Sequence, residues 1–386
     1  MIYNILFEAD KHWGATRPEE QYRSSYILKR LLADLKIDLF VSLGDFYDTK
    51  LLLNSRASVY ALRDMHDRAE ICRAKKIPMR VIRGTLSHDY DQLEAFSALM
   101  EDPKYDFRYF NHLTIEETLP EMRILYAPDE NVNYRKWMDL YEESFGTDEI
   151  HMACCHGNFD VILAKVALDT MDADDSTTLA FHYQDMMRRI RGPIIAGHWH
   201  NCNHHQNLYY AGSPDRWIFG EDETKGYVLV RYDTEQYAYQ FYKIPNFLAS
   251  QFKTFEVYTS NYGDAMTYQH LIDAVEQSLD GSHNLKVRIK VIVDELYSDT
   301  EAQILNLKYH FATNKRVVIV IENKVKTAKK QEEKKQMDQM TEVYGFVKDK
   351  KTSVAKKIWL WIKVFYGKEY PLKQIEAIVN PELENR

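Results

Sequence analysis

Imidazole and carboxylate side chains recur where apolar segments end in the first 200 residues. They are Asp10 and His12 after IYNILFEA, Asp45 after DLFVSL, His156 after HMACC, and His198 and His200 after GPIIAG. Each apolar segment has the length and composition of a buried strand. Mixed nitrogen and oxygen donors suit Mn, Fe, Zn or Co better than Ca or Mg. The pattern therefore predicts a transition-metal site built from several strand ends.

The spacing of these residues favours two ions over one. Asp10 and His12 are two positions apart, as are His198 and His200, and residues i and i+2 of an extended segment point the same way. The carboxyl ends of parallel strands meet at one crevice. Six ligands exceed what one catalytic ion uses, whereas two ions about 3.5–4 Å apart can share them. Such a pair of ions activates a bridging hydroxide, which attacks a phosphoester. Asp45 is the candidate for the bridging carboxylate.

The elements that must position these residues form an α/β pattern. The segments above, with PMRVIRG and MRILYAP, read as buried strands, and residues 18–37 have the apolar spacing of a helix, with Pro18 near its start. After about residue 245 the order changes to β-α-β, then a helix and a strand. We expect a domain over 1–245, a smaller α/β domain over 250–322 that caps it and binds DNA, and a Lys-rich and apolar C-terminal region over 323–386.

Composition places the chain among globular proteins. Hydrophobic residues make up 45% of the 386 residues, which is enough for a sizeable core. We find no signal peptide and no apolar run long enough to span a membrane. The four cysteines have no disulfide spacing, and two are adjacent, so we expect a reducing compartment, the cytoplasm.

Charge is unevenly distributed along the chain. The net charge is −8, but residues 324–368 hold 13 Lys and 5 acidic residues, a local charge of +8. The asymmetry indicates a polyanion-facing tail on an acidic body, with a solvated charged helix as an equally weighted alternative.

Together these motifs resemble the calcineurin-like metallophosphoesterases. The five stretches Asp10-x-His12, Gly44-Asp45, Gly84 to Asp89, His156-Gly157 and Gly197-His198-x-His200 look like the five motifs of that family. Gly44 to Thr49 and the Tyr210-Ala211-Gly212-Ser213-Pro214 stretch, followed by Phe219-Gly220-Glu221, resemble the SbcD-type nucleases of double-strand-break repair, whose phage-encoded homologues have similar lengths. The resemblance covers residues 1–245 and implies a layered α-β-β-α sandwich.

The resemblance implies a role for each motif residue. Asp10, His12 and His200 would bind the first ion, Asp45 would bridge, and His156 and His198 would bind the second. His88 would stabilise the transition state or protonate the leaving oxygen, and Asp89 would orient His88 by a carboxylate–imidazole hydrogen bond. The family usually has Gly-Asn-His-Asp, in which Asn ligates the second ion. Here the loop is two residues longer and Ser87 precedes His88, so we expect Ser87 at the Asn position and one tight and one loose metal site.

The resemblance also implies a substrate and partners. It predicts a DNA nuclease subunit that acts as an exonuclease on double strands and as an endonuclease on single strands. The subunit would use two Mn²⁺ ions, with Mg²⁺ as the alternative. The implied partners are DNA, a second copy of the chain and an SbcC-type coiled-coil ATPase, which would contact apolar residues 358–365. Two alternatives stay open: a nucleotide or protein phosphatase of the same superfamily, and a degenerate scaffold without catalysis.

Overall fold

The computed structural model describes most of the chain, and the account below is confined to that part. The described residues are 1–130, 137–139, 141–142, 149–162, 180–221, 223–261, 265–282, 284–297, 299–325, 353–366 and 371–376. They divide into two compact units. Unit 1 comprises 1–253 with 281–286, and unit 2 comprises 254–280 with the residues from 287 onward. The predicted three-part division of the chain stays a prediction.

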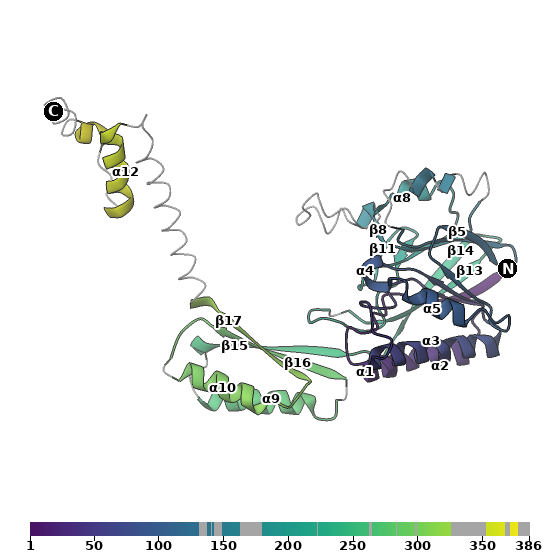
Figure 1. Cartoon of the computed structure of the whole chain (residues 1–386), viewed down its shortest axis with the longest axis horizontal. Coiled ribbons are helices and arrows are strands. Elements are labelled where there is room, and N and C mark those ends of the chain that lie inside the picture. The colour runs from purple at the N-terminus through teal and green to yellow at the C-terminus, as the bar shows by residue number, and fades with distance from the viewer. Residues whose placement is uncertain are drawn as a thin grey trace. The chain divides into compact units, whose positions relative to one another are not determined.

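Unit 1 is a mixed α/β structure with two six-stranded sheets (Figure 1). The first sheet has the order β14-β13-β1-β2-β3-β4, with bounds Ala238–Pro245, Gly226–Asp233, Ile2–Glu8, Leu39–Ser42, Met79–Ile82 and Phe107–Phe110. Strands β1, β2, β3 and β4 are parallel, and β13 and β14 form an antiparallel hairpin beside β1. The α/β class predicted from the sequence is confirmed.

The second sheet supplies the other half of the core. Its order is β11-β12-β10-β7-β6-β5, with bounds Asn203–His205, Leu208–Tyr210, Ile194–Gly197, Met152–His156, Met122–Ala127 and Thr114–Leu119. Strands β6, β7, β10 and β12 are parallel. One apolar cluster joins Phe7 and Val41 of the first sheet to Tyr126, Cys154 and Ile195 of the second, so the two sheets pack face to face.

Helices cover the outer face of the first sheet. They are α1 (Pro18–Ser24), α2 (Tyr26–Asp34), α3 (Arg56–Lys75), α4 (Leu86–Asp89) and α5 (Gln92–Leu99). Leu28 and Leu32 of α2 and Met65 of α3 share a buried cluster with Phe40 and Val81 of the strands. Burial of this apolar surface is the main favourable contribution to folding.

The helix predicted over 18–37 is divided at Ser25. The hydroxyls of Ser24 and Ser25 both donate to the carbonyl of Gln21, at 2.9 and 3.0 Å. Hydroxyl bonding of this kind to a carbonyl one turn earlier bends helices. The sequence pattern predicted the start of the helical segment at Pro18 but missed this break and the end of α2 at Asp34.

The outer face of the second sheet also carries a buried cluster. Short strands β8 (Asn158–Phe159) and β9 (Ala180–Phe181) and helix α8 (Tyr183–Met186) contribute to it. Phe159 and Tyr183 pack there with Ala153 and Ala196 of the sheet.

Unit 2 contains a three-stranded sheet and two helices. Strands β15 (Gln251–Tyr258), β16 (Leu285–Val293) and β17 (Val317–Asn323) stand in that order, and helices α9 (Ala265–Leu279) and α10 (Thr300–His310) lie on one face of the sheet (Figure 1). The 3-10 turn η1 spans Thr259–Asn261. Val287, Ile289 and Val291 of β16 are buried and alternate with Arg288 and Lys290, so one face is apolar and the other charged. Lys290 forms ion pairs with Glu256 and Glu322 on this charged face.

The apolar segment near the C-terminus forms helix α12 (Val354–Tyr366). Much of the Lys-rich stretch that precedes it lies outside the described residues. Among the helices that the structure describes, none has the length and apolar character needed to cross a membrane.

Candidate metal centre

The predicted histidine and aspartate ligands gather where four strands end, and these strands belong to two sheets. Asp10 and His12 follow β1 and Asp45 follows β2, whereas His156 ends β7 and His198 follows β10. The Asp10 Oδ1 atom accepts a hydrogen bond from the His198 backbone N–H at 2.8 Å, which ties the two sheets together at the site. The centre is therefore built from the strand ends of both sheets.

Backbone conformation at the ligands is unusual. The φ angles of Asp10, His12, Asp45 and His198 are 52°, 50°, 48° and 101°. Positive φ in residues other than glycine carries a strain of about 1–3 kcal/mol each and concentrates at functional sites. These turns direct the side chains back across the strand ends toward one another.

Two glycines permit the close approach of the ligand loops. A Cβ atom at Gly44 would lie 2.6 Å from both Gly84 Cα and His156 Nδ1. A Cβ atom at Gly84 would lie 2.2 Å from Asp45 Oδ1. Both distances are too short for any side chain, so both positions require glycine.

The donor atoms form two groups that share Asp45. One group is Asp10, His12 and Asp45, and the other is Asp45, His156 and His198; within each, one donor atom per residue lies within 4.8 Å of the others. The His156 Nε2 atom is 3.3 Å and the His12 Nε2 atom 3.8 Å from the same oxygen, Asp45 Oδ2. A carboxylate in this position can bridge two cations.

Polar atoms without partners indicate that the centre fits cations. Within the part of the chain that is described, Asp10 Oδ2 and His198 Nδ1 are buried and have no hydrogen-bond partner. Burial of an unpaired polar group is costly, and a bound ion would satisfy both atoms. His/Asp donor sets of this kind can hold divalent metal ions.

Each of three histidines has its outer ring nitrogen fixed by an acceptor. His12 Nδ1 is 3.2 Å from Asp48 Oδ1, His200 Nδ1 is 3.2 Å from Glu221 Oε1, and His156 Nδ1 is 2.6 Å from the Leu43 carbonyl. Donation from Nδ1 leaves the lone pair on Nε2, which then faces the centre. Asp48 and Glu221 were not selected from the sequence, although Gly44 to Thr49 and Phe219-Gly220-Glu221 were recognised as family-like stretches.

Charges inside the centre shift several pKa values. Burial acts to raise the pKa of Asp45, but the nearby His156 and His12 outweigh it and hold this pKa below its usual range. Burial and the neighbouring His156 lower the pKa of His198 to about 4. Asp45 is therefore ionised and His198 neutral near pH 7, which are the forms that bind metals.

The hydroxyl nearest the second donor group belongs to Thr85 and not to Ser87. Thr85 Oγ1 is 3.3 Å from both Asp45 Oδ2 and His156 Nε2, and its backbone N–H donates to Asp45 Oδ1 at 2.6 Å. Ser87 is exposed on the short helix α4. The expectation that Ser87 takes the family's Asn position is wrong, because the longer loop turns into a helix after Thr85 and carries Ser87 outward.

The contacts of Asp89 also differ from expectation. Its carboxylate accepts from the Tyr47 N–H at 2.9 Å and the Gly84 N–H at 2.7 Å. The His88 Nδ1 atom instead bonds the backbone carbonyl of Asp48. The expected carboxylate–imidazole bond between Asp89 and His88 is therefore wrong: Asp89 joins two loop backbones, and Asp48 orients His88. His88 still lies at the centre, with its ring centroid 4.8 Å from that of His12.

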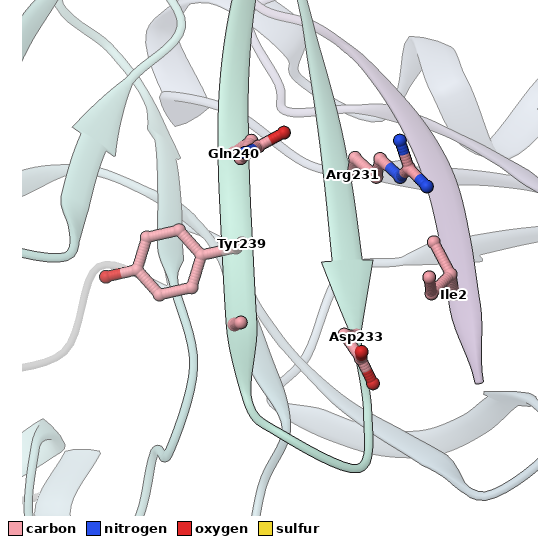
Figure 2. Close-up of a pocket in the computed structure, with 6 residues that line it drawn as sticks. Ile2, Arg231, Asp233, Tyr239 and Gln240 are labelled. Carbon is pink, nitrogen blue, oxygen red and sulfur yellow. The ribbon is translucent and has the colours of Figure 1, made fainter.

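A separate hollow lies at the opposite end of β1 from Asp10. Ile2, Arg231, Asp233, Tyr239 and Gln240 line it, on strands β1, β13 and β14 (Figure 2). Ile2 begins β1, whereas the candidate ligands follow its last residue. This hollow is therefore distinct from the metal centre.

Comparisons with known proteins add little to this description. No family model and no curated protein matches the chain. One crystal structure is 11% identical, covers 63% of this chain and 99% of its own, and has a TM-score of 0.37. The glutamine-dependent NAD+ synthetase from Acinetobacter baumannii in complex with ADP is 9% identical, with coverage of 94% and 71% and a TM-score of 0.27. These scores are too low to carry an argument about fold or function.

Proposed function

We propose that this protein is a dinuclear metal-dependent phosphodiesterase that hydrolyses the DNA backbone. The observation that supports it most directly is the sharing of Asp45 between two groups of donor atoms. The expected ions are Mn²⁺, with Mg²⁺ as the alternative. The two face-to-face sheets with helices on an outer face agree with the α-β-β-α sandwich that the family resemblance implies.

The residues have separable tasks in this proposal. Two bound divalent ions would supply a clamp for the phosphate and activate water for in-line attack. Asp10, His12 and His200 would hold one ion and His156, His198 and Thr85 the other. His88, oriented by the Asp48 carbonyl, would contact the phosphate and stabilise charge or donate a proton to the leaving oxygen.

DNA is favoured over a phosphoprotein or a nucleotide by the rest of the chain. The Tyr210 to Pro214 stretch and the Phe219-Gly220-Glu221 stretch resemble nucleases, and Glu221 contacts the candidate ligand His200. A phosphatase would leave unit 2 without a role.

The first test is cleavage of linear DNA labelled at the 5′ or 3′ end. Mn²⁺, Mg²⁺ and EDTA are compared, with Asp45→Asn, His88→Ala and the exposed control Asp102→Asn. We expect Mn²⁺-dependent cleavage that Asp45→Asn abolishes and His88→Ala lowers by about 10²–10⁴-fold. Turnover of a generic phosphodiester without cleavage of DNA would favour the phosphatase, and no turnover of either would favour the scaffold.

We also propose that the C-terminal region binds a coiled-coil ATPase of the SbcC type and that the chain forms a homodimer. Helix α12 contains the predicted contact residues Ile358 to Phe365, and Ile358 is exposed. Aromatic and aliphatic side chains of this kind dominate binding energies at interfaces. Deletion of 324–386 should abolish co-purification with the ATPase; retained binding would refute this part of the proposal.

A further inference from the structure

We propose that Trp217, which lies beside the candidate ligand His12, is a stacking platform for an unpaired nucleobase next to the scissile phosphate. This inference rests on the proposed DNA nuclease function and adds a preference for unstacked bases.

Trp217 is held beside a candidate ligand. Its ring centroid lies 6.1 Å from that of His12, and its backbone N–H donates to Glu221 Oε2 at 3.1 Å. The guanidinium of neighbouring Arg216 donates to the carbonyls of Glu221, Ser250 and Glu223, at 2.7, 2.9 and 2.7 Å. The segment is therefore anchored, whereas the indole itself is only half-buried. A rigid, partly exposed aromatic ring next to the centre is what a stacking platform requires.

The residue after the indole is also apolar and exposed. Ile218 follows Trp217 directly and is 63% exposed. A base stacked on the indole would offer this side chain an apolar surface.

A nucleobase suits the Trp217 ring better than the other parts of a phosphodiester substrate do. Phosphate and sugar are polar, whereas every base has an apolar π-face that stacks on aromatic rings without regard to sequence. Apolar side chains can also insert between base steps and unstack them. A base inside a duplex is covered on both faces, so the platform favours single strands, frayed ends and hairpin loops.

The test compares the binding of two single strands of equal charge, a dT12 strand and a fully abasic strand of the same length. Dissociation constants are measured by fluorescence anisotropy with Ca²⁺ in place of the catalytic ions. Wild type should prefer dT12 by about 5- to 100-fold. Trp217→Ala should lose most of this preference, Trp217→Phe should keep it, and Ile218→Ser should reduce it. Leu99→Ser, an equally apolar and exposed change on α5, is the control and should not alter it.

Two further readouts distinguish the possible failures. Melting temperature and Mn²⁺ affinity should match wild type in each variant, which shows that His12 keeps its place. If Trp217→Ala weakens both strands equally, or if wild type binds both equally, Trp217 only packs against His12 and the inference is overturned. If the wild-type protein cleaves no DNA, that result would instead contradict the proposed nuclease function.

Discussion

The Nε2 atoms of His12 and His200 lie 3.1 Å apart. The other ring nitrogen of each histidine faces a carboxylate, Asp48 or Glu221, so both Nε2 atoms carry lone pairs when the Nδ1 atoms donate. Two lone pairs at this distance repel each other unless a cation lies between or beside them. At the same distance one Nε2 atom donates a hydrogen bond to the other whenever it carries a proton, so a proton and a metal ion compete for this position.

Removing the carboxylate that contacts His200 should weaken binding of the first ion. Glu221→Gln keeps the size of the side chain but loses the charge that orients the imidazole and raises its basicity. We expect a loss of about 10- to 100-fold in affinity for that ion, measured by calorimetric titration with Mn²⁺. Glu94→Gln, an exposed carboxylate bonded to Asn111, is the control. Unchanged affinity in Glu221→Gln would show that Glu221 does not support a metal ligand.

Substitutions of Thr85 and Ser87 should differ in their effect on the binding of the second ion. Thr85→Val removes the hydroxyl that lies 3.3 Å from His156 Nε2 while keeping the shape of the side chain. It should weaken the second site on the order of tenfold, whereas Thr85→Ser and Ser87→Ala should leave it unchanged. A hydroxyl is a weaker ligand than the family's amide, so wild type should show one tight and one loose site. Two equally tight Mn²⁺ sites would contradict this.

Metal binding should release protons. Burial acts to lower the pKa of His156, but its attraction to Asp45 outweighs burial and raises this pKa to about 10. His156 is then protonated at neutral pH in the metal-free protein, and an ion must displace that proton. Apparent Mn²⁺ affinity should rise by up to about tenfold per pH unit between about pH 6.5 and 8.5. Calorimetry in two buffers of different ionisation enthalpy should count at least one proton, and a count of zero would contradict the assignment.

A buried ion cluster should dominate the stability of the region below the centre. Arg68, Glu8 and Asp64 are fully buried, and the Arg68 guanidinium contacts both carboxylates. Arg68→Met leaves Glu8 without this partner and Asp64 with the Lys29 pair alone, and should cost about 3–5 kcal/mol in urea unfolding. Arg73→Met on the same helix removes an exposed pair with Glu70 and should change the stability far less. Equal effects of the two substitutions would refute the role of burial.

Much of the site could be read from the sequence because its signals are local. The apolar runs before Asp10, Asp45, His156 and His198 gave strands that the structure has at the same places. The two-residue spacing predicted that Asp10 and His12 lie together, and the positions of the strand ends predicted that all these ligands meet at one site. The packing of two sheets into one core, and the hairpin of β13 and β14 beside β1, carry no such signal, because they depend on contacts between residues more than 100 positions apart.

Sequence alone determined the residue types that can bind metal, their order and the strands that precede them, because these depend on composition and short-range periodicity. Tertiary structure alone decided that Thr85 and not Ser87 reaches Asp45, that Asp89 bonds backbone and not His88, and that Asp48 and Glu221 orient the histidines. The physical reason is that a loop's path and a hydrogen-bond partner depend on distances set by packing. A shift of two residues along a chain can move a side chain from the centre to solvent.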